Sequence, residues 1–424
     1  MFAAGCRMLH AQRVKLLVFA HIPPPHHGQS YMVKLMLDGF GGDARTRDKS
    51  AIRNPQSAIE CYHVNAQVSD NMEDIGTFRF GKILALLRYC LEAIWCRFRY
   101  GVRAFYYVPA PGKRAALYRD WIVMLMCRPF FRERIYHWHA SGLGDWLKRE
   151  GNWFERWLTH RLLGKPKLGL SLAIPSMRDA LWFRSGSVEI VANGIPDPCP
   201  DFDKAIRPRR EARASARRRL MAGETLTASE SENAGAEPEV FRVLYLAHCT
   251  REKGVFDTIE GVRIANERLR VQGSKLRVHA TLAGAFIFPE EEGELKAAIE
   301  KANAGGQCIT LAGFVSGETK QRLLIESDCL CFPTYYNAEG QPVSLLEAMA
   351  YGLQIITTRW RAIPEMLPAD HPGFCALRDP ADVASKLIAV CAHDALALRD
   401  HFLTSYTARQ YVTMLDTALR STSC

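Results

Sequence analysis

One stretch of this 424-residue chain, Asp328 to Thr358, constrains the fold more than any other. Asp328 to Pro333 is apolar after its first residue, as in a short buried strand, and Leu353 to Thr358 is a second such run. Between them a helical run ends with Tyr351, before Gly352. The order strand, loop, helix, strand predicts a βαβ unit in a parallel sheet, with its loop at the carboxyl ends of the strands.

Two glutamates flank the loop of this unit. Glu339 precedes the predicted helix start near Val343 and Ser344, and Glu347 lies about one helical turn inside the helix. Free N–H groups at a helix start bind phosphate groups. Carboxylates accept hydrogen bonds, Glu339 from sugar hydroxyls and Glu347 from the two ribose hydroxyls. The pattern therefore indicates a site for a sugar nucleotide.

Glu347 also has a purely structural interpretation. Ser344 followed three residues later by a glutamate matches a capping box, in which each side chain satisfies a backbone N–H of the first turn. The spacing by itself leaves both interpretations open. Pairing with Glu339 and with a second motif favours the binding role.

The second motif lies earlier in the chain. Val243 to Ala247 predicts a buried strand, and a helical segment runs from Val255 to about Leu269. The residues between them read His-Cys-Thr-Arg-Glu-Lys-Gly and end with Lys253 and Gly254. Each charged residue alone fits an exposed loop, but their order relative to Glu339 favours a functional role for Lys253.

Together these motifs resemble the donor-site signature of family 4 retaining glycosyltransferases, the bacterial polysaccharide type of glycosyl transferases group 1. The matching features are Glu-x7-Glu followed by Ala-Met-Ala-x-Gly, and a Glu-Lys-Gly turn. The resemblance implies the α/β fold called GT-B, with two Rossmann-like, doubly wound domains facing a cleft and a C-terminal helix crossing back to the first. It also implies metal-independent transfer of a sugar to an acceptor hydroxyl, with retention by a front-face mechanism.

The resemblance also implies roles for residues of the second domain. Lys253 neutralises the diphosphate, and His248 stands where many members carry arginine, with Arg251 as the available substitute. Gly313 and Val315 belong to a turn that faces the nucleobase through backbone atoms.

The loop after the first glutamate departs from the family pattern. Members usually have an aromatic-Gly pair there, whereas this chain has Gly340-Gln341-Pro342. Pro342 has no N–H, so one phosphate donor is absent, and the N–H groups near Val343 and Ser344 are expected to hold the leaving group.

Two residues of the first domain complete the predicted site. Gly28 ends the loop after the strand-like run Val14 to Ala20, where a missing Cβ lets backbone approach a phosphate. His139 follows the run Ile135 to Trp138 and matches the family histidine beside the reacting sugar. Glu339, Lys253 and His139 are the candidate catalytic residues.

The histidines also suggest a metal. His137 and His139 share one side of a strand, and His26 and His27 lie in an earlier loop, but no third ligand has a fitting position. Asp201-Phe202-Asp203 resembles an acidic metal motif but fits a solvated turn better. We expect no metal and no cofactor other than the nucleotide sugar.

Composition bounds the organisation of the chain. Its length allows two α/β domains, no apolar run approaches a spanning helix of about 18 residues, and no signal segment is evident, so we expect a cytoplasmic protein. The 13 cysteines show no zinc or disulfide spacing and are expected to be reduced core thiols. The expected divisions are an acceptor-side domain (1–203), a basic then acidic and Ser-rich insertion (204–239), a donor domain (240–400) and the returning helix (401–424), with the final helical segment running from Ala395 to Leu419.

A net charge of +10 calls for a partner or for another explanation. The arginine-rich run Lys204 to Arg219 fits a solvated, partly disordered linker, or a contact with anionic lipid or nucleic acid. Two further segments combine apolar and aromatic residues with arginines. In Lys82 to Arg103 the arginines are interleaved with the apolar residues, and after Trp121 to Met126 they follow closely. Each segment fits either a bilayer interface or helices packed on a sheet.

The expected partners are a nucleotide sugar, a saccharide or lipid-linked saccharide acceptor, and an anionic membrane surface on the inner face of the plasma membrane; nucleic acid is not expected. Two alternatives stay open: a nucleotide-sugar epimerase with the same fold, and a non-catalytic basic adaptor for membrane or nucleic acid. The sequence does not identify the sugar, the nucleobase or the acceptor.

Overall fold

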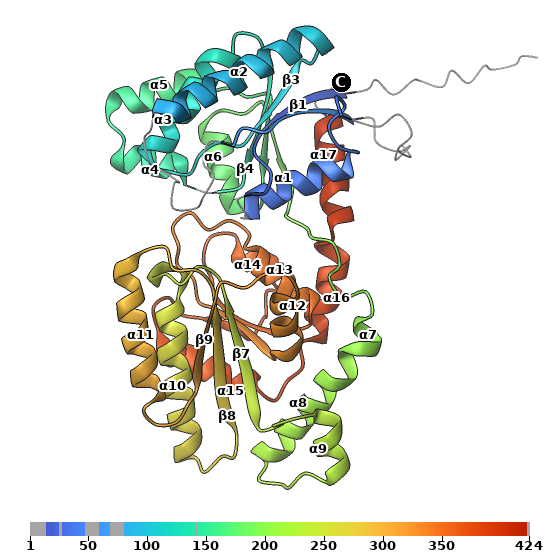
Figure 1. Cartoon of the computed structure of the whole chain (residues 1–424), viewed down its shortest axis with the longest axis vertical. Coiled ribbons are helices and arrows are strands. Elements are labelled where there is room, and N and C mark those ends of the chain that lie inside the picture. The colour runs from blue at the N-terminus through green and yellow to red at the C-terminus, as the bar shows by residue number, and fades with distance from the viewer. Residues whose placement is uncertain (1–13, 25–27, 47–58, 68–79, 141, 422–424) are drawn as a thin grey trace, which may run out of the picture. The chain divides into compact units, whose positions relative to one another are not determined.

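The computed structural model describes residues 14–24, 28–46, 59–67, 80–140 and 142–421. The chain forms two compact units, Met1–Ala192 with Tyr411–Cys424, and Asn193–Gln410. Each unit contains a parallel six-stranded sheet flanked by helices, as Figure 1 shows. The expected α/β class with two Rossmann-like sheets is confirmed. His26 and His27 lie outside the described residues.

The first unit is built on a sheet with the strand order β2-β1-β3-β4-β5-β6, in which all neighbours are parallel. Parallel sheets are covered on both faces, which explains why β1, β3 and β4 are almost entirely buried. The strands are β1 (Val14–Phe19), β2 (Ile59–Val64), β3 (Ala104–Tyr107), β4 (Glu133–Trp138), β5 (Leu168–Ser171) and β6 (Ser187–Ile190), and the helices are α1 (Gly28–Gly39), α2 (Phe80–Tyr100), α3 (Arg114–Cys127), α4 (Leu143–Glu150), α5 (Trp153–Leu163) and α6 (Met177–Trp182).

One face of this sheet carries a large apolar core. Phe105 and Tyr107 of β3 and Tyr136 and Trp138 of β4 pack there with buried residues of α2 to α6. Aromatic side chains contribute large buried areas, so this layer accounts for much of the unit's hydrophobic stabilisation.

The C-terminal helical segment differs from the expectation. Instead of one helix from Ala395 to Leu419, the structure has α16 (Leu396–Ser405) and α17 (Ala408–Ser421). Thr407 and Gln410 cap each other's backbone N–H groups, which starts a new helix at this point. Farther along α17, the Tyr411 hydroxyl donates to the carbonyl oxygen of Met32 on α1 at 3.2 Å, within the first unit.

The second unit has the strand order β12-β11-β10-β7-β8-β9, again with parallel neighbours. Its strands are β7 (Val240–Leu246), β8 (Arg277–Ala283), β9 (Ile309–Gly313), β10 (Cys329–Phe332), β11 (Gln354–Thr358) and β12 (Phe374–Cys375). Its helices are α7 (Phe202–Ala205), α8 (Arg207–Met221), α9 (Ala228–Ala234), α10 (Val255–Val271), α11 (Pro289–Asn303), α12 (Gly317–Glu326), α13 (Val343–Ala350), α14 (Ile363–Met366) and α15 (Pro380–Val390), with α16 following.

The order of this second sheet reverses beside β7. The chain moves outward from β7 through β8 and β9, then returns to the opposite side of β7 for β10, β11 and β12. The loops after β7 and β10 therefore leave the carboxyl ends of adjacent strands in opposite directions. Open α/β sheets usually bind their ligands at such a switch point.

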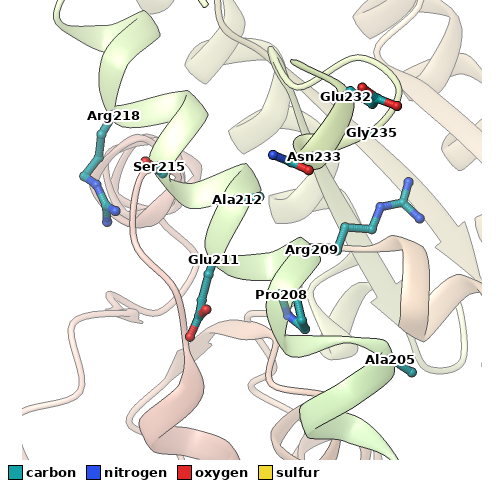
Figure 2. A pocket seen from close by; sticks show the side chains of 10 residues that line it. All are labelled: Ala205, Pro208, Arg209, Glu211, Ala212, Ser215, Arg218, Glu232, Asn233 and Gly235. Carbon is teal, nitrogen blue, oxygen red and sulfur yellow. The ribbon is translucent and has the colours of Figure 1, made fainter. Parts of the chain in front are cut away.

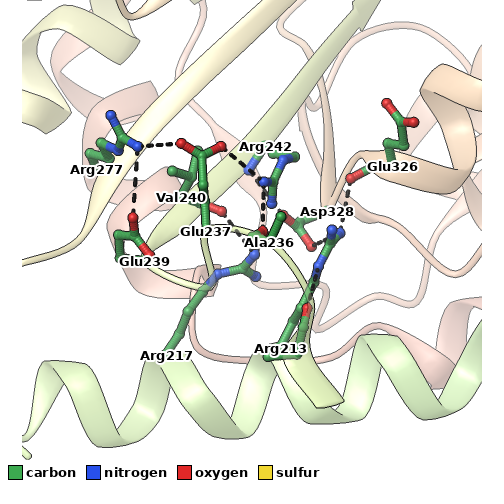
Figure 3. Close-up of polar contacts among 11 residues, drawn as sticks. Arg213, Arg217, Ala236, Glu237, Glu239, Val240, Arg242, Arg277, Glu326 and Asp328 are labelled. Carbon is green, nitrogen blue, oxygen red and sulfur yellow. Dashed lines mark hydrogen bonds and ion pairs between the residues drawn. The ribbon is translucent and has the colours of Figure 1, made fainter. Parts of the chain in front are cut away.

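A buried carboxylate fixes the start of β10. Asp328 pairs with Arg213 at 3.3 Å and with Arg217 at 2.6 Å, and it accepts the backbone N–H of Arg242 on β7 at 2.9 Å (Figure 3). Burial alone would raise the pKa of Asp328, but Arg217 and Arg213 hold that pKa below its ordinary value. The charged form is therefore the stable one.

Helix α8, which carries Arg213 and Arg217, also caps the C-terminus of α12. Arg210 donates to the carbonyl oxygens of Ser327 at 2.6 Å and Leu324 at 3.0 Å, and Arg213 donates to that of Glu326 at 2.9 Å. The last carbonyls of a helix have no partner inside the helix, and its C-terminus is electronegative, so arginines suit this position.

The interpretation of the basic run as a solvated linker is therefore wrong for its central residues. Arg210, Arg213 and Arg217 of α8 are buried, because they satisfy a carboxylate and a helix end that composition does not reveal. Residues of α8 and α9 line an open pocket of about 780 Å³, shown in Figure 2; among them are Arg209, Glu211 and Glu232. None of these lining residues belongs to the two motifs.

Two expectations from composition can be compared with the structure. The cysteines of the described part of the chain are all free and buried, as expected for reduced core thiols. Within the same residues, no helix has both the length and the apolar character needed to cross a membrane.

Replacing Asp328 with alanine leaves two buried arginines without their counter-ion. We expect Asp328→Ala to lower the free energy of unfolding by about 3–5 kcal/mol, measured by denaturant unfolding. Because the folded state lowers the pKa of Asp328, its stabilisation is complete above the ordinary value of 3.8 and is lost as the pH falls through the folded-state pKa.

The matched control is Asp203→Ala. Asp203 pairs with Arg207 on the surface, so its loss should change stability by less than about 1 kcal/mol. Equal effects of the two substitutions would contradict the structural role of Asp328.

Candidate functional site

Lys253 and Glu339 meet at the switch point of the second sheet. Lys253 ends the short 3-10 turn η2 (Arg251–Lys253) after β7, and Glu339 lies in the loop between β10 and α13. The Nζ of Lys253 lies 2.7 Å from Oε2 of Glu339, and the two side chains are only 17% and 7% exposed. Sheet topology thus brings together two motifs that are 86 residues apart.

The turn after Lys253 requires glycine. Gly254 has a φ of +81°, and a Cβ there would lie 2.5 Å from the carbonyl oxygen of Pro333. Just before it, the carbonyl oxygen of Glu252 accepts the N–H of Tyr335 at 2.8 Å. The η2 turn therefore lies directly against the loop after β10, and this contact fixes the position of Lys253.

Two further side chains complete the ion pair, and the sequence patterns did not identify them. The Thr334 hydroxyl donates to Oε2 of Glu339 at 3.1 Å. The Nζ of Lys253 lies 4.6 Å from the centre of the Tyr336 ring, within cation–π distance. Their position directly after β10, between a strand and the first glutamate, is the signal that could have found them.

The other two basic candidates differ from Lys253. Burial lowers the pKa of His248, and the charge of Lys253 lowers it further, so this imidazole is neutral near pH 7. Arg251 forms an ion pair with Glu294 of α11 and lies over the Phe256 ring at 4.1 Å. Lys253 is the basic candidate that lies at Glu339.

Glu347 is paired with a lysine instead of capping its helix. The N-cap of α13 is Pro342, which makes Ser344 the second helical residue, and no side chain caps this end. The capping-box interpretation is therefore wrong. Oε1 of Glu347 lies 2.6 Å from Nζ of Lys320 on α12, a partner that only the tertiary structure reveals.

The remaining candidates of this unit lie on loops at the same sheet edge. Gly313 ends β9 with a φ of +67°, and half-buried Val315 follows before α12. Gly340 is half-buried beside Glu339, and Val343 and Ser344 open α13.

The departure from the family pattern has a structural counterpart. Gln341 follows Gly340 and its side-chain oxygen accepts the N–H of Asn193 at 2.8 Å, while Asn193 donates from its amide to the Gln341 carbonyl at 3.1 Å. This reciprocal pair anchors the loop before α13.

The candidates from the first domain lie in the first unit. Gly28 is the first residue of α1, after β1, and His139 directly follows β4. The rings of His137 and His139 lie 4.0 Å apart, on one side of the strand, and Tyr106 is hydrogen-bonded to Nδ1 of His137 at 2.6 Å. Burial, and then His139, keep the pKa of His137 well below its ordinary value.

These histidines do not assemble a metal site with other ligands. Across the ranges that the structure describes, no group of three or more histidine, cysteine or acidic side chains could hold a metal ion. Asp203 of the acidic turn pairs with Arg207, and Phe202 is buried against Gly352.

The site offers two carboxylates, Glu339 and Glu347, each paired with a lysine, Lys253 and Lys320. Lys253 can donate three hydrogen bonds, whereas Glu339 and Glu347 can only accept them. Each carboxylate is held by a lysine, so its charge is compensated without a ligand. A ligand that carries both phosphate and hydroxyl groups could exchange partners with the pairs at little electrostatic cost.

The protonation state of His248 can be tested by NMR. We expect its ring protons to titrate with a pKa below the ordinary 6.5, because burial and Lys253 both disfavour the charged ring. Lys253→Ala should raise this pKa, and Lys34→Ala on α1 of the first unit should not, with the signals assigned from a His248→Gln spectrum. A wild-type pKa above 6.5 would contradict the buried, neutral ring.

Comparisons with known proteins agree with these motifs. Residues 241–393 match the family model described as "Glycosyl transferases group 1". The chain is 31% identical over 170 residues to the amylovoran biosynthesis glycosyltransferase AmsK of Erwinia amylovora. That match covers 36% of this chain and 39% of AmsK, so the chain aligns with about two fifths of this curated relative.

Solved structures resemble the whole chain in fold. The structure of Anabaena Alr3699/HepE in complex with UDP has a TM-score of 0.61 at 14% identity and covers 96% of this chain and 100% of its own. Sucrose-phosphate synthase from Thermosynechococcus elongatus has a TM-score of 0.62 at 14% identity, with 96% and 99% covered. Residues 241–393 are therefore similar to the glycosyl transferases group 1 family, and the structure has the GT-B fold.

Proposed function

We propose that this protein is a glycosyltransferase that moves a sugar from a nucleotide-diphosphate sugar to a hydroxyl group of a saccharide acceptor. The observation that carries this proposal is the pair of Lys253 and Glu339 at the switch point of the second sheet. The family match over the same residues and the polysaccharide-related name of AmsK support it.

In this proposal the ion pair opens when the donor binds. The Nζ of Lys253 turns to the diphosphate, and the carboxylate of Glu339 accepts hydrogen bonds from sugar hydroxyls. Glu347 takes the ribose hydroxyls, held in place by Lys320. The turn with Gly313 and Val315 faces the nucleobase, and Gly340 lets the loop come close to the phosphates.

During transfer the bond from the anomeric carbon to the diphosphate oxygen breaks, and negative charge grows on the leaving group. Lys253 and the N–H groups of Val343 and Ser344 stabilise that charge at the start of α13. His248 is neutral and serves as a hydrogen-bonding group, and Arg251 adds a more distant positive charge. These groups need no metal ion to balance the diphosphate.

The first unit supplies the acceptor side in this proposal. The acceptor oxygen bonds to the anomeric carbon on the face that the diphosphate leaves, its proton passes to the departing phosphate oxygen, and the configuration is retained. His139 and Gly28 border the reacting sugar. The acceptor is a lipid-linked or growing surface saccharide, and the enzyme works in the cytoplasm with no cofactor besides its donor.

Calorimetry with uridine, guanosine and adenosine diphosphate sugars tests the donor site. The UDP in the Anabaena structure makes uridine the first choice. With chelator present, we expect one nucleotide class to bind the wild type and to bind Lys253→Ala at least tenfold more weakly, because a charged hydrogen bond contributes about 1.5–3 kcal/mol.

Lys34→Ala is the matched control, since Lys34 is an exposed lysine in an i,i+4 pair with Asp38. It should bind the donor as the wild type does. Failure of every donor to bind, or equal binding by Lys253→Ala, would contradict the proposal and favour the basic adaptor. Release of free sugar or nucleotide without any acceptor would favour the epimerase.

A further inference from the structure

Large apolar side chains are exposed together on three helices of the first unit. They come from α2, from α3 with the turn that follows it, and from α5. We call this surface the aromatic face. It consists of Leu84, Leu91, Trp95, Phe98, Leu125, Phe130, Trp153, Phe154 and Trp157. Contiguous exposed apolar surface of this kind marks an interaction site.

Helix α2 shows that the exposure is systematic. Its buried residues, Leu86, Cys90, Ala93 and Cys96, recur every three or four positions and pack into the core of the sheet. A second row on the opposite side, at positions 84, 88, 91, 95 and 98, is exposed and apolar except for Arg88. A helix packed only against its own sheet would carry polar residues on that second row.

The aromatic face is continuous across the helices. α2, α3 and α5 lie side by side over one face of the first sheet (Figure 1). Phe98 of α2 meets Phe130 edge to face at 5.8 Å. On α5, the ring centre of Phe154 lies 5.9 Å from those of Trp153 and Trp157, and 6.2 Å from that of Trp121 on α3.

Trp153 is 76% exposed and Phe98 is 69% exposed, far more than aromatic side chains are when they fill a core. The structure therefore presents their rings to whatever covers this face.

The uncompensated charge on α2, α3 and α5 is positive. Their three carboxylates are each held by an arginine: Glu92 by Arg45, Asp120 by Arg119 and Glu155 by Arg114. Asp120 and Glu155 are also buried.

Other arginines of the same helices remain at the surface. Arg88 and Arg99 on α2 and Arg156 and Arg161 on α5 are exposed around or within the apolar rows. The outward surface is therefore both aromatic and positively charged.

We propose that the aromatic face binds a bilayer surface that contains anionic phospholipid. Tryptophan and phenylalanine enter the region between headgroups and acyl chains, while the arginine side chains reach the phosphates. A second copy of this chain would bring the same positive charges against each other, whereas an anionic bilayer compensates them. The inference goes beyond the proposed function and does not depend on it.

Vesicle flotation with the full-length protein tests the proposal. Vesicles of phosphatidylcholine alone are compared with vesicles that contain about a quarter phosphatidylglycerol, and the wild type should bind the anionic ones at least tenfold more strongly. Trp153→Ser/Trp157→Ser and Trp95→Ser/Phe98→Ser should each reduce binding by about tenfold or more, because exposed rings lose their insertion. Arg88→Gln/Arg99→Gln should reduce the preference for anionic lipid.

The control is Val271→Ser/Leu403→Ser, which removes exposed apolar side chains of the second unit and should float as the wild type does. All variants change exposed residues and should keep the wild-type melting temperature and donor binding, which separates this test from that of the proposed function. Wild type that does not float, or face variants that float normally, would overturn the proposal. A wild-type dimer that becomes monomeric in Trp153→Ser/Trp157→Ser would assign the face to a second copy and overturn it as well.

Discussion

The buried carboxylate of Asp328 is the interaction on which the second unit depends. It accepts an N–H of Arg242 on β7 and, through its own N–H, donates to the Arg242 carbonyl at 2.7 Å. These bonds set β10 beside β7, and that adjacency creates the reversal of strand order. A buried charge is costly unless it is paired, so the arginines of α8 are a condition for the arrangement and not an addition to it.

The candidate site lies at the carboxyl ends of β7 and β10, and it depends on the pairing of these two strands. Gly254 lets the turn after β7 approach Pro333 after β10, so Lys253 reaches Glu339 over a short distance. Without a ligand, the two charges satisfy each other in a largely buried place. A donor that offers phosphate to the lysine and hydroxyls to the glutamate replaces one set of contacts with another, which keeps the cost of opening the pair low.

Sequence patterns predicted the features of the fold that neighbouring residues and the order of the strands determine. The βαβ unit, the parallel sheets and the order of Lys253 and Glu339 were accessible because local periodicity and short motifs determine them. The predicted site roles themselves still await a test. The partners Lys320, Thr334 and Tyr336 could not be predicted, since each contact depends on how separate loops pack.

Two interpretations failed for the same reason. The spacing of Ser344 and Glu347 suits a capping box, but the helix begins at Val343, directly after Pro342, so Ser344 lies inside it, and Lys320 pairs with the carboxylate. The arginines of α8 have the composition of a solvated linker, yet they are buried because a carboxylate and helix carbonyls more than 100 residues away receive them. Composition describes a segment alone and not the groups that it meets.

The central claim is that the ion pair of Lys253 and Glu339 opens when a sugar nucleotide binds, so that Lys253 contacts the diphosphate and Glu339 contacts the sugar. A crystal structure with a bound nucleotide sugar tests it most directly. The account predicts Nζ of Lys253 within about 2.7–3.2 Å of a diphosphate oxygen, and Glu339 at the same distance from a sugar hydroxyl. A donor bound elsewhere, with the Lys253–Glu339 pair still closed, would contradict it.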